Sequence, residues 1–176
     1  FLGNTDPKKN TPGTLKAYAE YVRRSEKPLP LLIADLGEQP AEAILREIGE
    51  PRLRGMLRLA GYIPNSDLPA IYNRASAFLY TSLRESFGIP QLEAMACGTP
   101  VVTSATSAIP EVAGQGAILV DPTDPTAIAD ALLRLETDAE FRAGQVAYGL
   151  ERVKQFSWEK TARHLLALYE SLGKTN

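Results

Sequence analysis

The sequence is poor in the residue types that build disulfides and transition-metal sites. Its 176 residues include one cysteine, Cys97, and one histidine, His164. A single cysteine excludes an internal disulfide framework, and one Cys with one His falls short of the four ligands of a structural zinc site. The loops expected at the ligand-binding edge of the sheet also lack an Asp-x-Asp pair that would hold a divalent cation beside a phosphate. The sequence therefore predicts no bound metal.

The chain also lacks a strong excess of charge and a long apolar run. Lys and Arg number 19 and Asp and Glu number 21, which gives a formal net charge of −2. This balance argues against a nucleic-acid-binding arm or a polybasic membrane face as the dominant feature. No apolar run approaches the roughly 20 residues of a membrane-spanning helix, and no signal peptide is visible. We therefore expect a cytoplasmic chain with no nucleic-acid partner.

Short apolar runs predict the strands. The length fits one domain of about 100–200 residues, and we expect residues 1–176 to form a single domain. Because Phe1 lies inside an apolar stretch, we expect a piece of a larger protein. The runs are too short for helices, and most are rich in Val, Ile, Leu or aromatic residues, as in parallel strands buried on both faces. The predicted strands are Phe1–Gly3, Leu29–Leu36, Leu57–Ile63, Ala77–Tyr80, Pro100–Thr103 and Ala117–Val120.

Helix-period stripes alternate with these runs. They cover 15–22, 68–75, 128–135 and 158–172. Strands that alternate with helices indicate βαβ units, and right-handed crossovers then give a Rossmann-like, doubly wound parallel sheet of about six strands in an α/β fold. Ligands of such sheets bind beyond the carboxyl ends of the strands. The loops at that edge are 4–12, 34–40, 62–67, 81–90 and 104–110.

The most informative loop precedes a predicted helix. It follows the strand that ends at Tyr80 and finishes at Gly88, and Pro90 suits the first turn of a helix. We expect this helix to run to Cys97 and to stop at Gly98. A helix start that follows a strand and a glycine carries free amides and the positive end of the helix dipole, and both bind anions. The amides expected to be free belong to Phe87, Gly88, Ile89 and Gln91.

Two carboxylates, Glu85 and Glu93, bracket this predicted anion site. By residue type alone they could form a general acid–base pair. Glu93 is better placed to accept hydrogen bonds from ribose hydroxyls, as an acidic residue does in dinucleotide-binding folds. The alternative is that Glu93 is an ordinary helix glutamate, solvated or paired with a lysine.

Glu85 and Glu93 form an E-x7-E motif that resembles the signature of family 4 glycosyltransferases, which are retaining enzymes with the GT-B fold. The flanking residues, Ser-Phe-Gly-Ile-Pro and Leu-Glu-Ala-Met-Ala-Cys-Gly-Thr-Pro-Val-Val, fit as well. So do, in order, the segments Gly3–Asn10 (compare the family's G-R-x-D-x-x-K-N), Gly61–Pro64 followed by Leu68, and Pro110–Gly114 before Leu119–Pro122. The resemblance covers essentially the whole chain but only the C-terminal, donor-binding domain of these enzymes. It implies an N-terminal acceptor domain that this sequence does not contain.

The resemblance also implies residue roles. Glu93 would accept the ribose hydroxyls, Glu85 would lie beside the donor sugar, and Lys9 would neutralise the diphosphate leaving group. Glu85 and Lys9 are thus the expected catalytic residues. The amides of Ser86, Phe87, Gly88 and Ile89 would hold sugar and phosphate oxygens, and Tyr62, Ile63 and Leu68 would cradle the base.

One position departs from the family's pattern. Asn4 stands where these enzymes often have an arginine that pairs with Lys9 on the diphosphate. Either Arg84 or Lys8 substitutes for that arginine, or the phosphate is held more weakly. Because an asparagine can still donate hydrogen bonds, Asn4 stays a candidate substrate-binding residue.

The implied activity is transfer of a hexose from a nucleoside-diphosphate sugar to a saccharide or lipid-linked acceptor, in polysaccharide biosynthesis. A UDP-sugar is expected rather than GDP-mannose, with no cofactor besides the donor. The full-length enzyme would be cytoplasmic or peripheral at the inner face of the membrane, and the isolated domain would be inactive. Two alternatives remain: a nucleotide-binding α/β module without transferase chemistry, and a GT-B type sugar epimerase. P-loop and G-x-G-x-x-G motifs are absent.

The last predicted helix carries the clearest apolar stripe, at Trp158, Leu165, Leu166, Tyr169 and Leu172. Such a stripe is expected to be part of the core. In the resembling family the last helix commonly crosses back to the N-terminal domain, so we expect part of the stripe to be exposed in this chain.

Overall fold

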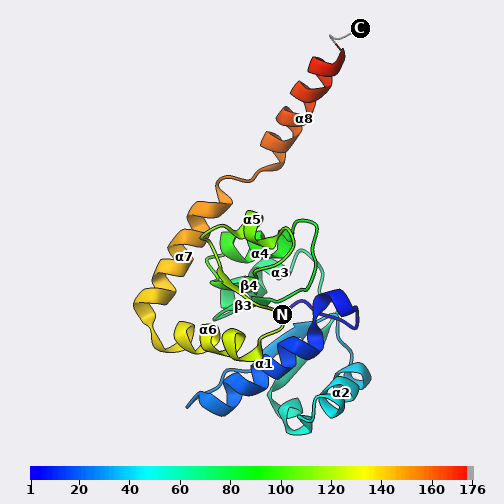
Figure 1. The fold of residues 1–176 in the computed structure, drawn as a ribbon, viewed down its shortest axis with the longest axis vertical. Helices are drawn as coiled ribbons and strands as arrows, with labels where there is room; N and C mark the ends of the chain where they lie inside the picture. The colour runs from blue at the N-terminus through cyan, green and yellow to red at the C-terminus, as the bar shows by residue number, and fades with distance from the viewer. Residues whose placement is uncertain (174–176) are drawn as a thin grey trace.

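A computed structural model of the chain describes residues 1–173, so the last three residues of the predicted 1–176 domain lie outside the described residues. Strands and helices alternate along the chain, as predicted (Figure 1). The strands are β1 (Leu31–Ala34), β2 (Leu57–Gly61), β3 (Phe78–Tyr80), β4 (Val101–Ser104) and β5 (Ile118–Val120).

Residues 1–173 also form eight α-helices and two short 3-10 helices. The α-helices are α1 (Thr11–Arg24), α2 (Glu38–Glu47), α3 (Leu68–Arg74), α4 (Ile89–Ala96), α5 (Ile109–Ala113), α6 (Pro125–Thr137), α7 (Ala139–Val153) and α8 (Trp158–Gly173). The 3-10 helices are η1 (Pro7–Lys9) and η2 (Pro51–Met56).

All strand pairs are parallel, as predicted, but the described strands form two sheets, β1-β2 and β3-β4-β5. The segment predicted as a first strand, Phe1–Gly3, pairs with β1 only through a single bridge between Leu2 and Ala34. After this bridge the N-terminal segment turns away from β1. The turn is held by the Asn4 side chain, which accepts the Asp6 N–H at 2.8 Å. Within residues 1–173 there are thus five strands and one bridge where about six strands were expected.

Two strands end earlier than the apolar runs predicted. β1 stops at Ala34 because Asp35 adopts a left-handed conformation with φ +62°. β2 stops at Gly61, whose φ is also +62°. Extended pairing cannot continue through a left-handed residue, so both loops turn away at the carboxyl edge of the sheet.

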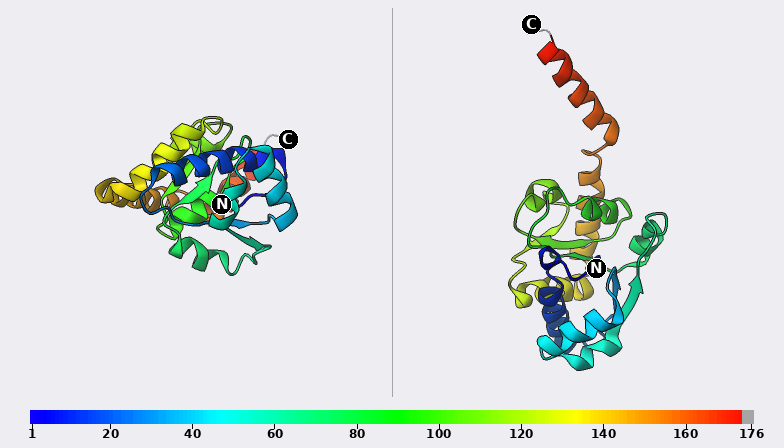
Figure 2. Two further views of the ribbon diagram at one scale, coloured as in Figure 1. Left: turned by 90° about the horizontal axis from the view of Figure 1, so that it is seen from below. Right: turned by 90° about the vertical axis from the view of Figure 1, so that its right-hand side faces the viewer.

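The core lies on both faces of the strands, as a doubly wound fold requires. Successive side chains of a strand point to opposite faces. Leu79 of β3 and Val102 of β4 belong to the cluster formed with α1 and α6, whereas Phe78 and Val101 belong to the cluster formed with α3, α4 and α5. Figure 2 shows these helix layers on either side of the strands.

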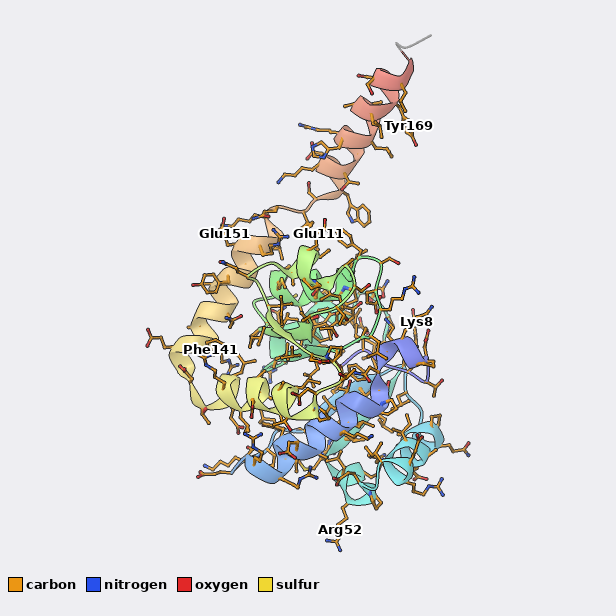
Figure 3. The ribbon with its side chains drawn as sticks, viewed as in Figure 1. Lys8, Arg52, Glu111, Phe141, Glu151 and Tyr169 are labelled. Atoms are coloured by element: carbon orange, nitrogen blue, oxygen red, sulfur yellow. The ribbon has the colours of Figure 1, made fainter. Side chains whose placement is uncertain are left out.

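The C-terminal helix α8 departs from the prediction that its stripe is part of the core. None of its residues is buried, and the exposed fraction is 79% at Trp158 and 62% at both Tyr169 and Leu172. Ser157 caps the helix by accepting the Lys160 N–H at 3.1 Å. Beyond this cap α8 projects from the body as an arm, and the labelled Tyr169 lies clear of all other elements (Figures 1 and 3). The whole helix, rather than part of it, is exposed.

Two features complete the architecture. α7, which the sequence did not predict, packs against α4 and α6 and carries the chain to the base of the arm. In the described part of the chain, no helix combines the length and the apolar content that a membrane-spanning segment requires.

Candidate functional site

Loops from distant parts of the sequence meet at the carboxyl edge of the strands. Asn10 caps α1 in a left-handed conformation (φ +55°), and its side-chain amide donates to the Thr81 carbonyl at 3.1 Å and to the Pro122 carbonyl at 2.8 Å. The Leu83 N–H donates to the Lys8 carbonyl at 2.7 Å. These bonds hold η1 against the loop that follows β3.

This arrangement brings the two predicted catalytic residues into contact. The Lys9 ammonium lies 2.8 Å from Oε1 of Glu85, with side-chain exposures of 29% and 18%. It also lies 5.7 Å from the centroid of the Tyr80 ring, within range of a cation–π interaction. Ser107 fixes the Glu85 backbone, because its Oγ donates to the Glu85 carbonyl at 2.7 Å and accepts the Glu85 N–H at 3.3 Å.

The ion pair keeps Glu85 charged. Burial by itself raises the pKa of the Glu85 carboxyl, but the hydrogen bond and the charge of Lys9, together with the Ser82 and Tyr80 hydroxyls, outweigh burial, so the pKa lies below its ordinary value. The cluster therefore presents a fixed ammonium whose charge is already shared with a carboxylate.

The start of α4 offers unpaired backbone donors. Gly88 is the N-cap, with φ +87°. Within residues 1–173, the amides of Ser86, Phe87, Gly88 and Ile89 donate to no other group. The expectation that the Gln91 amide is also free is wrong, because Gln91 N–H donates to the Gly88 carbonyl at 3.3 Å and closes the first turn.

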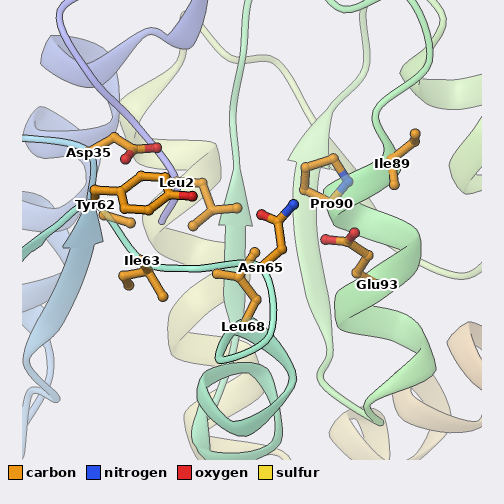
Figure 4. A pocket seen from close by; sticks show the side chains of 10 residues that line it. Leu2, Asp35, Tyr62, Ile63, Asn65, Leu68, Ile89, Pro90 and Glu93 are labelled. Carbon is orange, nitrogen blue, oxygen red and sulfur yellow. The ribbon is translucent and has the colours of Figure 1, made fainter.

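A cavity of about 240 Å³ opens on the other side of this helix start (Figure 4). It lies beyond the ends of β1 and β2, where the chain passes to the second sheet, and ligands of doubly wound folds bind at such switch points. Predicted site residues lining the cavity are Tyr62, Ile63, Leu68, Ile89 and Glu93. Residues that were not predicted but also line it are Leu2, Ala34, Asp35, Asn65 and Pro90.

Glu93 is oriented toward the cavity by a buried tyrosine. The Tyr72 hydroxyl donates to Oε2 of Glu93 at 3.2 Å, and the Tyr72 ring packs edge-on against Phe78. Burial, together with the Glu93 charge, raises the pKa of Tyr72 above its ordinary value, so the phenol stays protonated and remains a donor. The Glu93 carboxylate reaches into the cavity (Figure 4).

Six predicted site residues do not line the cavity. Lys9 and Glu85 form the ion pair, and the Asn4 side-chain oxygen accepts the Asp6 N–H in a local turn. Phe87 packs edge-on against Phe156 in the connector that precedes α8, with ring centroids 5.8 Å apart. Ser86 and Gly88 complete the loop before α4. The predicted site is thus divided into an ion-pair cluster and a cavity, with the first turn of α4 between them.

The sequence contained a signal for two lining residues that were not singled out. Asp35 directly follows β1, and Asn65 lies four residues after β2, in loops that were assigned to the carboxyl edge of the sheet. A polar side chain immediately after a buried parallel strand is a candidate ligand contact for this reason alone. No group of three or more His, Cys, Asp or Glu side chains able to hold a metal ion occurs in residues 1–173.

Taken together, the parallel strands covered on both faces and the cavity at their switch point define a doubly wound α/β domain of the kind that binds ligands at the carboxyl ends of its strands. Residues 1–152 match the family model "Glycosyl transferases group 1". The chain therefore belongs to this glycosyltransferase family.

Curated relatives are sugar-transferring enzymes. The chain is 35% identical, over 98% of its length, to O-antigen chain mannosyltransferase B of Escherichia coli, and spans 45% of that protein. It is 32% identical, over 98% of its length, to a D-inositol 3-phosphate glycosyltransferase of Corynebacterium jeikeium, and spans 43% of it. The chain thus spans less than half the length of these relatives.

Solved structures share the fold. Sucrose-phosphate synthase of Thermosynechococcus elongatus superposes with a TM-score of 0.80 at 30% identity, over 99% of this chain and 45% of the synthase. HepE of Anabaena, solved in complex with UDP, superposes with a TM-score of 0.82 at 18% identity, over 97% of this chain and 48% of HepE. At 18% identity the second likeness supports the fold alone.

Proposed function

We propose that this chain is the donor-binding domain of a retaining hexosyltransferase of family 4, which transfers a hexose from a nucleoside-diphosphate sugar to a saccharide or lipid-linked acceptor. The observation that carries the proposal is the set of four unpaired amides at the start of α4, between the Lys9 ammonium and the cavity that contains Glu93. A diphosphate needs donors and a cation, and an attached ribose needs an acceptor close by.

The chemistry follows from these positions. When the bond between the anomeric carbon and the diphosphate oxygen breaks, its electron pair stays on the diphosphate. The Lys9 ammonium and the amides of Ser86 to Ile89 stabilise that charge, and because they are fixed in place they need no reorganisation during the reaction. Glu85, released from Lys9 as the phosphate binds, lies beside the sugar and accepts a hydroxyl hydrogen or supports positive charge near the anomeric carbon.

The acceptor site is proposed to lie on the N-terminal part of the full-length enzyme, which would close over the cavity and exclude water. The isolated chain should then bind nucleotide and transfer nothing.

We expect the full-length enzyme to be cytoplasmic or peripheral at the inner face of the membrane. No metal is assigned to the reaction, because Lys9 takes the cationic role. The titration below also compares UDP, which the sequence led us to expect, with GDP.

The test is a calorimetric titration of the chain with UDP, GDP and NAD. We expect at least one nucleoside diphosphate to bind and NAD to bind more weakly. Glu93→Ala should reduce nucleoside diphosphate affinity about tenfold or more, and Lys9→Ala should do the same, because each removes a charge-assisted contact. Glu140→Gln, at an exposed position on α7, removes one carboxylate elsewhere and should change nothing. Equal binding of NAD, or no effect of Glu93→Ala, would favour a nucleotide-binding module without transferase chemistry.

A further inference from the structure

The cavity has two chemically different ends. Glu93 and Pro90 of α4 form one end, and Asp35 and Tyr62 form the other (Figure 4). The inference that follows rests on the proposed function, in which Glu93 accepts the ribose hydroxyls. A nucleoside held by its ribose at Glu93 directs its base toward Asp35 and Tyr62.

Asp35 is held in an unusual way at this end. Its backbone has φ +62°, a left-handed conformation that costs a non-glycine residue conformational energy. Its N–H donates to the Gly61 carbonyl at 2.7 Å, which ties the loop after β1 to the end of β2. Its carboxylate has neither a hydrogen-bond nor an ion-pair partner within the described residues, although it lines the cavity. Strain kept at a ligand cavity is a reason to look for function.

The other groups near this end are consistent with a hydrogen-bonding role. The Asn65 side chain lies on the wall between Asp35 and Glu93 and has no partner within residues 1–173. No lysine, arginine or histidine is among the residues that line the cavity. A base that enters therefore meets a carboxylate without a nearby cation to neutralise it.

We propose that Asp35 is a specificity-determining residue that selects guanine. The edge of guanine presents N1–H and the exocyclic N2 amino group side by side, and the two oxygens of one carboxylate can accept from both. Guanine O6 lies next to these donors and suits the Asn65 amide. Uracil presents one N–H between two carbonyl oxygens, and at least one of these would face the Asp35 carboxylate. The donor of this chain is accordingly a guanosine-diphosphate sugar, rather than the UDP-sugar favoured by the sequence.

The experiment compares GDP, UDP and inosine diphosphate, which lacks the N2 amino group, by calorimetry on the chain. We expect GDP to bind about tenfold more tightly than UDP, and more tightly than inosine diphosphate. Asp35→Asn keeps the size and the tolerance for a left-handed backbone but removes the charge and one acceptor. It should lower GDP affinity about tenfold and remove most of the GDP preference.

Asp35→Gly serves as the second variant, because glycine adopts this backbone without strain and the chain should keep its thermal stability. Glu140→Gln is the matched loss of charge outside the cavity. UDP binding as tightly as GDP, or an unchanged GDP-to-UDP ratio in both Asp35 variants, overturns the proposal. If UDP binds more tightly and Glu93→Ala abolishes that binding, only the guanine assignment fails. If neither nucleotide binds, the proposed function fails with it.

Discussion

The Lys9 ammonium and the Glu85 carboxylate, 76 positions apart in the sequence, form an ion pair of 2.8 Å. The cation proposed to hold the diphosphate is therefore already partnered. Phosphate binding becomes an exchange, in which one anionic partner of Lys9 replaces another. Under the proposed function, this exchange would free the carboxylate as the donor sugar binds beside it.

The first prediction concerns the titration of Glu85. Replacement of Lys9 by Met removes the ion pair and leaves only the Ser82 and Tyr80 hydroxyls to oppose burial, so the pKa of Glu85 should rise above its value in the native chain. Carboxyl-carbon NMR measures the change directly. Lys8→Met, at the exposed neighbouring lysine, should leave the Glu85 titration unchanged. An unaltered Glu85 pKa in Lys9→Met would mean that the ion pair does not persist in solution.

The same ion pair makes a prediction about stability and pH. Because the pKa of Glu85 is lower in the folded protein than in the unfolded chain, its contribution to stability is present above about pH 4.5 and is lost as the pH falls through the folded pKa. In Lys9→Met this downward shift of the Glu85 pKa is smaller. The difference in unfolding free energy between the native chain and Lys9→Met should therefore shrink from pH 7 to pH 3. Urea denaturation at the two pH values measures it, and a constant difference would contradict the assignment.

Gly88 and Gly144 should respond in opposite directions to substitution by alanine. At Gly88 (φ +87°) a Cβ atom would come within 2.8 Å of Gln91 Nε2 and 3.2 Å of Tyr80 Cε1, and the left-handed backbone adds strain. Gly88→Ala should destabilise the chain by about 1–3 kcal/mol and weaken nucleotide binding. At Gly144, inside α7, nothing lies within 4 Å of the place that a Cβ atom would take, and alanine should stabilise by about 1 kcal/mol. Thermal unfolding followed by circular dichroism distinguishes the signs.

Asn10 should be critical for holding η1 against the loop after β3. Asn10→Asp keeps a residue that tolerates the left-handed conformation but removes the donor to the Thr81 and Pro122 carbonyls. The expected loss is about 1–3 kcal/mol, since two carbonyls lose their donor and face a carboxylate. Asn73→Asp loses a comparable bond on the exposed surface of α3 and should cost about 0.5 kcal/mol or less. Equal losses of unfolding free energy in the two variants would contradict this role.

Tyr72 should act on binding rather than on stability. Tyr72→Phe keeps the buried ring against Phe78 and removes only the hydroxyl that donates to Glu93. The loss of one hydrogen bond of about 1 kcal/mol should weaken nucleoside diphosphate binding about fivefold, with little change in melting temperature. Tyr148→Phe, on the exposed side of α7, is the control and should alter neither measurement. Unchanged affinity in Tyr72→Phe would show that Glu93 needs no such support.

The succession of strands along the chain and their parallel direction could be predicted, because buried runs such as the one around Val101 have no polar alternation. The residues at which β1 and β2 end could not be predicted. They depend on the left-handed backbone of Asp35 and Gly61, and at Asp35 an aspartate takes a conformation that glycine usually adopts. The exposure of α8 was also underestimated, because an apolar stripe has the same period whether or not a surface is present to cover it.

At the site, motif order was enough to identify Lys9, Glu85 and Glu93 as candidates. It could not show that the first two form an ion pair, because their contact depends on loop bonds such as those of Asn10. The Gln91 amide was expected to be free, since sequence does not reveal that the first turn of α4 closes in the 3-10 manner. Asp35 requires the three-dimensional cavity to be recognised as a ligand contact.

The position of the single tryptophan has a practical consequence. Trp158 begins the projecting helix and is 79% exposed, whereas the buried aromatic side chains of the body are tyrosines and phenylalanines. Indole fluorescence thus reports on the arm separately from the remainder of the chain. A spectral blue shift would reveal any surface that comes to cover the arm, without the attachment of a dye.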